Sequence, residues 1–281
     1  VSIIASEDSS AFREAIEALG AELRGSGHRV QTLGLPLRPE DAPSLAASNL
    51  VITLGARAAQ LTSGLAPRSL ILHTLLPRSA YDRLPLRHED NRRISAVFID
   101  QPPARQIELL RIALPEWNRV ALITGRDSAE LAARLQASAR DKRMRTILEQ
   151  ISEENELYPT LQRALREPGI LLAVPDSMLF NNRTISNILL TAYHHHSPVV
   201  GFSPAYAKAG ALIALYSTPA QVGQQAGEAA RQGLNTGSLP SPAHPRQFRV
   251  STNPYVARSL GIVLEDAQTL RERLERSEGA P

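Results

Sequence analysis

Residues 171–234 read LLAVPDSMLFNNRTISNILLTAYHHHSPVVGFSPAYAKAGALIALYSTPAQVGQQAGEAARQGL, and this stretch decides the fold. Three short apolar runs in it end in small polar clusters, at Asp176-Ser177, Phe202-Ser203 and Tyr216-Ser217. Segments with helical spacing of apolar residues lie between the runs. Such alternation predicts a parallel sheet with helical crossovers, whose strands end at one edge where α/β proteins bind ligands. We therefore expect the polar tips to form one wall of a small-molecule site.

The remainder of the chain repeats this alternation in two series, separated at Gln101-Pro102-Pro103. The strands are predicted at residues 2–6, 28–35, 50–55, 69–76 and 94–100, and then at 119–125, 144–151, 169–176, 198–203, 211–217 and 248–252. The helices are predicted at residues 10–24, 56–61, 106–114, 128–140, 153–166 with a break at Tyr158-Pro159, 181–193, 218–234, 254 onward and 265–276, and residues 36–43 are predicted as loop. The pattern predicts an α/β protein with two Rossmann-like lobes, each able to build its own core.

Composition excludes several functional classes. The chain has 281 residues, of which 43% are hydrophobic and 21% are charged, and a formal net charge of +3. It contains no cysteine, which excludes disulfides, zinc–thiolate sites and cysteine nucleophiles. No apolar run reaches the about 20 residues that cross a bilayer. Basic residues are scattered and no nucleic-acid-binding motif occurs, so nucleic acid is not an expected partner.

Five segments carry a family resemblance. They are DQPPARQIELLRIALPEWNRVALITG (100–125), AVPDSMLFNN (173–182), SPVVGFSPAYAKAGALIALYS (197–217), QVGQQAGEAARQGL (221–234) and FRVSTNPYVARSLGI (248–262). In these segments the chain resembles the ABC transporter substrate-binding proteins, in particular their uncharacterised or tryptophan-binding-like class, which have the type I periplasmic binding protein fold. The resemblance covers most of residues 94–262.

The resemblance implies an architecture and a role. It implies that the chain crosses between the lobes three times, near residues 99–101, 217–218 and 239–245. The N-terminal lobe would then hold residues 1–100 plus 218–242, the C-terminal lobe 101–217 plus 243–262, and residues 263–281 would form a helical tail. It also implies a periplasmic or other extracytoplasmic location and an export signal upstream of Val1, which could add a lipid anchor. The protein would be a monomer that closes by hinge motion on a small solute, with an amino acid-like compound as one candidate, and docks on an ABC permease.

The candidate ligand-binding residues lie at the predicted strand tips. Helix N-termini follow these tips and offer unpaired N–H groups to a carboxylate. Asp176 could pair with a solute ammonium group, and Phe202 or Tyr206 could pack on an apolar part. Read singly, Asp176, Ser177 and Ser203 could equally be helix caps. The full candidate set is Ser6, Glu7, Gly55, Ala56, Arg57, Thr74, Gln101, Asp176, Ser177, Phe202, Ser203, Tyr206 and Tyr216.

The chain departs from its relatives mainly in the N-terminal half. Relatives commonly carry a small residue and proline after the third strand and an Asp-Pro pair after the fourth, where this chain has Gly55-Ala56 and then 75–78 as Leu-Leu-Pro-Arg. They also tend to have Asp-Tyr where this chain has Leu215-Tyr216. Asp176-Ser177 is kept. The contact of the C-terminal lobe therefore carries over better than those of the N-terminal lobe.

Two other patterns suggest chemistry that we do not expect. His194-His195-His196 suggests a metal, but adjacent helical side chains point about 100° apart and seldom close a metal site. Ser203 in GFSPAY matches the G-x-S-x-G nucleophile elbow only in part, because Ala205 stands at the fifth position. No dinucleotide or P-loop fingerprint is present, so no cofactor is expected.

Two alternative functions stay open beside solute capture for import. The first is a ligand-sensing module of the same fold, coupled to a membrane receptor or kinase instead of a permease. The second is a serine hydrolase that uses Ser203. Permease and ATPase genes beside this one would favour import, and loss of esterase turnover in Ser203→Ala would favour the hydrolase.

Overall fold

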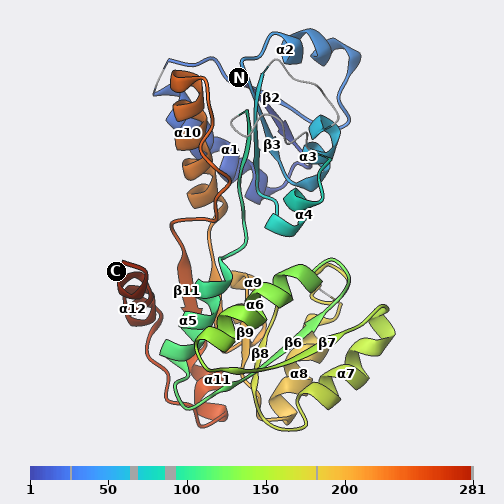
Figure 1. Ribbon diagram of the computed structural model, residues 1–281, viewed down its shortest axis with the longest axis vertical. Helices are drawn as coiled ribbons and strands as arrows, with labels where there is room; N and C mark the ends of the chain where they lie inside the picture. Colours follow the sequence, from blue (N-terminus) through green and yellow to red (C-terminus); the bar gives the residue numbers. More distant parts are fainter. Residues whose placement is uncertain (26, 64–68, 86–92, 182, 280–281) are drawn as a thin grey trace. The chain divides into compact units, whose positions relative to one another are not determined.

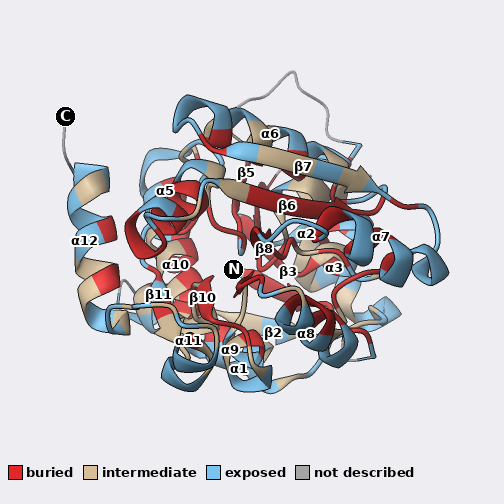
Figure 2. Cartoon of the chain, turned by 90° about the horizontal axis from the view of Figure 1, so that it is seen from below, coloured by how far each residue is buried: buried red, intermediate tan, exposed pale blue. Residues whose placement is uncertain are grey.

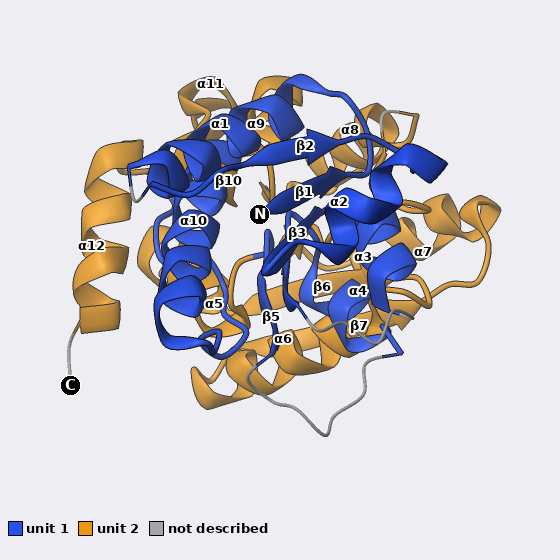
Figure 3. Ribbon diagram, turned by 90° about the horizontal axis from the view of Figure 1, so that it is seen from above, with its two compact units in different colours: residues 1–100, 217–248 blue, residues 101–216, 249–281 orange. Residues whose placement is uncertain are grey.

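The computed structural model describes residues 1–25, 27–63, 69–85, 93–181 and 183–279. The chain divides into two compact units (Figure 3). Unit 1 holds residues 1–100 and 217–248, and unit 2 holds residues 101–216 and 249–281. Each unit has its own sheet, so the predicted α/β fold with two Rossmann-like lobes is confirmed.

The sheet of unit 1 is parallel, with strand order β2-β1-β3-β4-β5. The strands are β1 (Ser2–Ala5), β2 (Gln31–Leu33), β3 (Leu50–Leu54), β4 (Leu70–Thr74) and β5 (Ile94–Val97). The helical segments are α1 (Ser10–Arg24), η1 (Pro39–Asp41), α2 (Ala42–Ala46), α3 (Ala56–Ser63), α4 (Arg78–Asp82) and α10 (Pro219–Thr236). Strands β1, β3 and β4 are buried throughout, and their continuous apolar runs fit a sheet covered on both faces.

The sheet of unit 2 has strand order β11-β10-β9-β8-β6-β7, parallel except for β11 at one edge. The strands are β6 (Arg119–Thr124), β7 (Arg145–Gln150), β8 (Ile170–Leu172), β9 (Val199–Gly201), β10 (Ile213–Tyr216) and β11 (Arg249–Thr252). The helical segments are α5 (Pro103–Ala113), α6 (Ala129–Asp141), η2 (Glu154–Glu156), α7 (Leu157–Ala164), α8 (Ile185–His194), α9 (Pro204–Ala209), α11 (Pro254–Ser259) and α12 (Ala267–Gly279). Figure 2 shows β6 almost wholly buried, whereas α12 keeps an exposed face.

Several helix boundaries follow directly from capping residues. The Thr218 hydroxyl accepts from the Gln221 N–H, and the Gln221 side chain accepts from the Thr218 N–H, which closes a capping box at the start of α10. Asn253 caps α11, because its side-chain oxygen accepts from the N–H groups of Tyr255 and Val256. The predicted break at Tyr158-Pro159 is wrong. Pro159 lies in the first turn of α7, where backbone N–H groups have no acceptor within the helix, so the N–H that proline lacks is not needed.

Residues 36–43, predicted as loop, contain η1 and the start of α2. The third passage between the units lies later than predicted, at 248/249, so residues 243–248 belong to unit 1. The physical reason is backbone pairing. The Phe98 N–H donates to the Ala243 carbonyl at 2.9 Å, and the Ala243 N–H donates to the Ala96 carbonyl at 2.9 Å. Residues 263–281, predicted as a separate tail, belong to unit 2, where α12 packs against α5 and β11 (Figure 1).

Candidate functional site

The carboxyl edge of the unit 2 sheet is organised around Asp176. This residue follows β8, and Gly125 follows the neighbouring strand β6. Oδ2 of Asp176 accepts from the Gly125 N–H at 3.0 Å and from the Ser128 hydroxyl at 2.6 Å, and Oδ1 accepts from the Met178 N–H at 3.1 Å. A Cβ at position 125 would lie 2.7 Å from Oδ2, so only glycine allows this approach. The carboxylate therefore ties the two strand tips together.

Asp176 is only 6% exposed, and these three partners all lie in unit 2. Its position at the point where the chain leaves β6 and β8 in opposite directions is where open α/β sheets place ligands. Our sequence reasoning missed Gly125 and Ser128. The signal was present in the Gly-x-x-Ser that follows β6, because the tip beside Asp176 must belong to the strand next to β8.

An aromatic cluster lies at the same edge. The ring centroids of Phe202 and Tyr206 are 4.8 Å apart, and Phe180 lies 6.4 Å from each. Phe202 is partly exposed, whereas Tyr206 is 4% exposed. Within the described residues the Tyr206 hydroxyl has no hydrogen-bond partner, and burial raises the pKa of Tyr206, so it stays a neutral donor. Phe180 was also missed, because its place beside Phe202 depends on how the segment after β8 folds.

The other candidate residues of unit 2 differ in availability. Ser177 is exposed, and Ser203 is half-buried before α9 with no capping bond from its side chain. The Tyr216 hydroxyl pairs with the Ser251 hydroxyl at 3.1 Å across β10 and β11. The Gln101 side chain is buried, and its Oε1 accepts from Nη1 of Arg105 at 2.8 Å. Ser177 is therefore exposed to solvent, and Phe202, Ser203 and Tyr216 are partly exposed.

The carboxyl edge of the unit 1 sheet brings Ser6 and Gly55 together. The Ser6 hydroxyl donates to the Leu54 carbonyl at 2.7 Å and accepts from the Ala58 N–H at 2.9 Å. Gly55 has φ of +83°, and a Cβ there would lie 2.7 Å from the Ser6 oxygen. The hydroxyl thus fastens the turn between β3 and α3, and both of its bonds stay within the backbone of unit 1.

Thr74 differs from its expected role at a strand tip. Thr74 is fully buried, and its hydroxyl donates to the Val97 carbonyl at 3.2 Å. The side chain therefore links β4 to β5 and does not face a ligand. Glu7 and Arg57 are exposed and Ala56 is half-buried. Glu7 lines a pocket of about 610 Å³ beside α1 and β2. Among the described residues of this edge, the candidate side chains are thus either exposed or half-buried, or they form hydrogen bonds to the backbone of unit 1.

A buried histidine lies one residue before Thr74. His73 is fully buried on β4, and its Nδ1 lies 2.6 Å from the Thr53 hydroxyl oxygen. Within the described residues its Nε2 has no hydrogen-bond partner, and the Tyr81 ring packs at 5.8 Å. Burial lowers the pKa of His73 to about 4, so the imidazole is neutral at pH 7.

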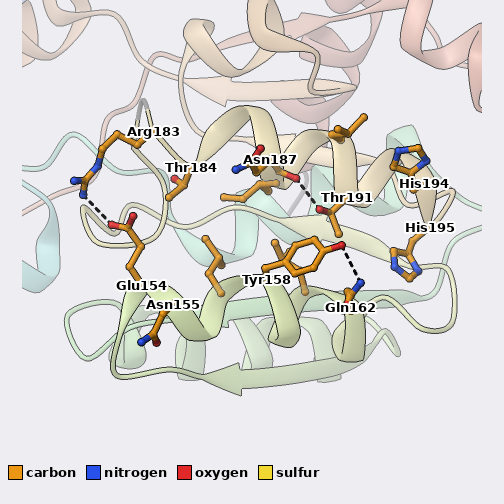
Figure 4. Close-up of a pocket in the computed structure, with 14 residues that line it drawn as sticks. Glu154, Asn155, Tyr158, Gln162, Arg183, Thr184, Asn187, Thr191, His194 and His195 are labelled. Carbon is orange, nitrogen blue, oxygen red and sulfur yellow. Dashed lines mark hydrogen bonds and ion pairs between the residues drawn. The ribbon is translucent and has the colours of Figure 1, made fainter.

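A cavity of about 720 Å³ lies between α7 and α8 of unit 2 (Figure 4). Figure 4 shows the Tyr158 ring between the helices, the Arg183–Glu154 ion pair at one end and His194 with His195 at the other. None of the sequence-predicted site residues lines it. Among the described residues, no group of three or more His, Cys, Asp or Glu side chains is placed to hold a metal ion.

Comparisons with known proteins place the chain in a family and match its fold. A family profile described as "ABC transporter substrate binding protein" matches residues 94–271, which is more than half of the chain. The chain belongs to this family. The match covers all of unit 2 but α12's last turns, together with β5 and α10 of unit 1. The Asp176 brace and the aromatic cluster both lie inside it.

Solved structures show the same fold at low sequence identity. A ligand-free, open substrate-binding protein with adhesive properties from Clostridium difficile, CD0873, has 15% identity and a TM-score of 0.73, with 94% of this chain and 95% of that chain covered. An ABC domain from Streptococcus pneumoniae in complex with L-Trp has 13% identity and a TM-score of 0.67, covering 96% and 97%. A conserved domain protein from Vibrio cholerae has 16% identity and a TM-score of 0.67, covering 96% and 97%. No curated protein matches the chain.

Membership confirms the predicted family and the predicted function of an extracytoplasmic solute-binding component. Substrate-binding proteins of this family serve ABC transport systems, so a small-molecule ligand and a permease are the expected partners in general terms. Across the described residues no helix is both long and apolar enough to span a bilayer. The family's activity is binding, and its members are typically not enzymes.

Proposed function

We propose that this substrate-binding protein captures a small solute with an aromatic or flat apolar part, of the amino-acid type, and delivers it to an ABC permease. The observation that carries the proposal is the partly exposed Phe202 ring, backed by Tyr206 at 4.8 Å and Phe180 at 6.4 Å, at the edge braced by Asp176. Aromatic rings stacked in this way offer a rigid apolar surface to a second ring. The L-Trp complex of the pneumococcal relative supports the solute class.

The polar ends of such a solute need hydrogen-bond partners beside the aromatic surface. Ser203 follows Phe202 directly, and Ser177 follows Asp176, and neither hydroxyl is buried. We assign to these hydroxyls the carboxylate or amine of the solute, and to Asp176 the task of holding the two tips in place. The candidate contacts of unit 1, Glu7, Ala56 and Arg57 among them, remain predictions for the opposite face of the solute.

Closure on the solute requires differential affinity. A solute shifts an open–closed equilibrium only as far as it binds the closed state better. The chain passes between its units at 100/101, 216/217 and 248/249, and these are the positions where we expect the hinge. We propose that the protein has no catalytic role, since among the described residues no hydrogen bond joins the Ser203 hydroxyl to a histidine or a carboxylate. A lipid anchor upstream of Val1 likewise stays part of the proposal.

Calorimetry and thermal unfolding with a defined panel test the proposal. L-tryptophan, L-tyrosine and L-phenylalanine are compared with L-leucine, L-glutamate and acetate. A solute present at 100 times its dissociation constant should raise the free energy of unfolding by about 2.7 kcal/mol. We expect this from at least one aromatic amino acid and not from acetate.

Two aromatic-to-alanine variants locate the binding surface. Phe202→Ala should abolish the stabilisation by the aromatic solute, whereas Tyr255→Ala, which removes a 75% exposed ring elsewhere in unit 2, should leave it intact. Equal behaviour of the two variants, or a panel in which only L-glutamate or L-leucine binds, would contradict the aromatic assignment. A panel with no binding at all would contradict solute capture of this class.

A further inference from the structure

The C-terminal helix α12 connects the two elements of unit 2 that receive the chain from unit 1. It packs against α5, which follows the first passage, and against β11, which follows the third. Leu270 and Leu274 anchor it and are fully buried. Its last turns, residues 272–279, lie beyond the residues that the family profile matches. A contact made by these turns is therefore not part of the matched family pattern.

One such contact is an ion pair between a buried arginine and a glutamate whose side chain is 34% exposed. Arg105 on α5 is 7% exposed, and its guanidinium is held by both carboxylate oxygens of Glu278. Nε donates to Oε1 at 2.5 Å and Nη2 donates to Oε2 at 2.9 Å. This parallel, bidentate arrangement is the strongest geometry for an arginine–carboxylate pair, and it fixes the plane of the guanidinium.

The third nitrogen of the same guanidinium reaches the first residue of unit 2. Nη1 of Arg105 donates to Oε1 of Gln101 at 2.8 Å, and Gln101 is 4% exposed. The main-chain carbonyl of Gln101 accepts from the Gln106 side chain at 2.9 Å. Both the carboxamide and the backbone of Gln101 are therefore held from α5, and the carboxamide is held by a group whose orientation Glu278 sets.

Burial makes this chain of contacts dependent on Glu278. Removal of the Glu278 carboxylate takes a bidentate partner away from the buried Arg105 charge, whereas a pair in which both side chains are exposed contributes little. The same helix carries a matched exposed pair, Arg271–Glu275 at 2.8 Å, whose side chains are 39% and 45% exposed. Loss of the Glu278 charge should release the Arg105 plane toward solvent and with it the Gln101 carboxamide, while loss of the Glu275 charge should change neither.

We propose that Glu278 acts through Arg105 as a positioning residue for Gln101, so that the end of α12 clasps the start of unit 2 at the first passage between the units. The clasp holds residues 101–106 in one conformation in the unliganded protein. Its effect on solute affinity rests on the proposed function, because Gln101 is a candidate solute contact; its effect on the backbone does not.

Hydrogen exchange of the full chain without solute tests the clasp itself. In Glu278→Gln, the amides of residues 101 and 104–106 should exchange at least ~10-fold faster than in Glu275→Gln, while amides around Leu270 and Leu274 keep their protection; Pro102 and Pro103 carry no amide hydrogen. Arg105→Lys, which keeps the charge but cannot bridge both partners, should reproduce this acceleration. Equal exchange of residues 101–106 in Glu278→Gln and Glu275→Gln would overturn the proposal, and so would an acceleration spread evenly over α12 and β11, which would indicate mere loosening of the helix.

Calorimetry with L-tryptophan as the probe gives the second readout. Glu278→Gln and Gln101→Ala should each weaken L-tryptophan binding about 5-fold, and the double variant should be no weaker than either single one, because both remove the same placed carboxamide. If the affinity losses of the two single variants multiply in the double variant, Glu278 does not act through Gln101, and the positioning role is overturned. If L-tryptophan binds neither the native protein nor any variant, the aromatic solute fails, and the exchange experiment still decides the clasp.

Discussion

The two sheet edges of this protein are built from similar strand tips but differ in what holds them. At the unit 1 edge, hydroxyls close backbone turns, as Ser6 does between Leu54 and Ala58. At the unit 2 edge, a buried carboxylate joins two strand tips, and an aromatic cluster lies beside it. The family profile leaves the first 93 residues unmatched and covers the unit 2 edge. This difference is the reason why we place the proposed aromatic solute contact in unit 2.

The largest effect is expected from removal of the Asp176 carboxylate. Asp176→Ala removes the acceptor of the Ser128 hydroxyl and of the Met178 N–H and leaves the Gly125 N–H only its 3.2 Å bond to the Ser128 oxygen, and it should lower the free energy of unfolding by about 4 kcal/mol. Urea unfolding measures the loss. Asp266 offers a matched control, because its carboxylate also accepts three hydrogen bonds but is exposed, so Asp266→Ala should cost clearly less. Equal losses would remove the distinction between a buried brace and a helix cap.

The next effect belongs to unit 1 and depends on pH. His73 has a pKa of about 4 in the folded chain against 6.5 unperturbed, so between these values the unfolded chain binds more protons. The stabilisation that comes from holding His73 neutral is therefore complete above pH 6.5. It is lost as the pH falls toward 4, where the free energy of unfolding has decreased by about 3 kcal/mol in total. Urea unfolding between pH 7.5 and 4 measures this slope. His73→Phe should be less stable at pH 7.5 but flatter over this window, and an unchanged slope would show that other groups cause it.

A smaller effect separates backbone strain from crowding at the unit 1 edge. Gly55 and Gly27 have φ of +83° and +77°, but only at position 55 would a Cβ meet a neighbour, the Ser6 oxygen at 2.7 Å. Gly27→Ala should cost about 1 kcal/mol for the strained backbone alone. Gly55→Ala should cost about 2 kcal/mol, since Ser6 must also move. If thermal unfolding gives the two variants the same loss, Ser6 is not held as tightly as its two hydrogen bonds indicate.

The smallest effect compares two tyrosines of unit 2. Tyr206→Phe removes a buried hydroxyl that has no partner among the described residues, and should raise the free energy of unfolding by about 0.5 kcal/mol. Tyr216→Phe removes the hydroxyl bonded to Ser251, and should lower it by about 0.5 kcal/mol. Opposite signs in urea unfolding are the expected result. A loss in Tyr206→Phe would mean that this hydroxyl already has a hydrogen-bond partner, such as a bound water.

The elements were largely predictable because their signals are local. The helix at residues 10–24 was predicted with the bounds that α1 has, since the apolar spacing lies within it and Gly25 follows it directly. The edge strand β2 was predicted as residues 28–35 but spans Gln31–Leu33, because the length of a strand depends on the partner strand beside it. The prediction at Pro159 was wrong because proline breaks a helix only in its interior, and Pro159 lies in the first turn of α7.

The candidate site was predictable only in part. Asp176, Phe202 and Tyr206 were found from the ends of apolar runs, which parallel strands bring to one edge. Gly125 and Phe180 were missed, because their importance comes from which strand neighbours β8 and from how the segment after it turns back. Thr74 was expected at a tip, but the pairing of β4 with β5 turned its hydroxyl into the sheet.

The sequence by itself determined the alternation of strands and helices, the two-unit plan and the family, because hydrophobic periodicity and short motifs are written in adjacent residues. Only the tertiary structure decided which polar groups are available. Gln101, Asp176 and Glu278 give no sign of their partners in the sequence, yet their side chains are bonded to residues 4, 51 and 173 positions away. Hydrogen-bond partners follow from strand order and helix packing, which bring distant residues within 3 Å of each other.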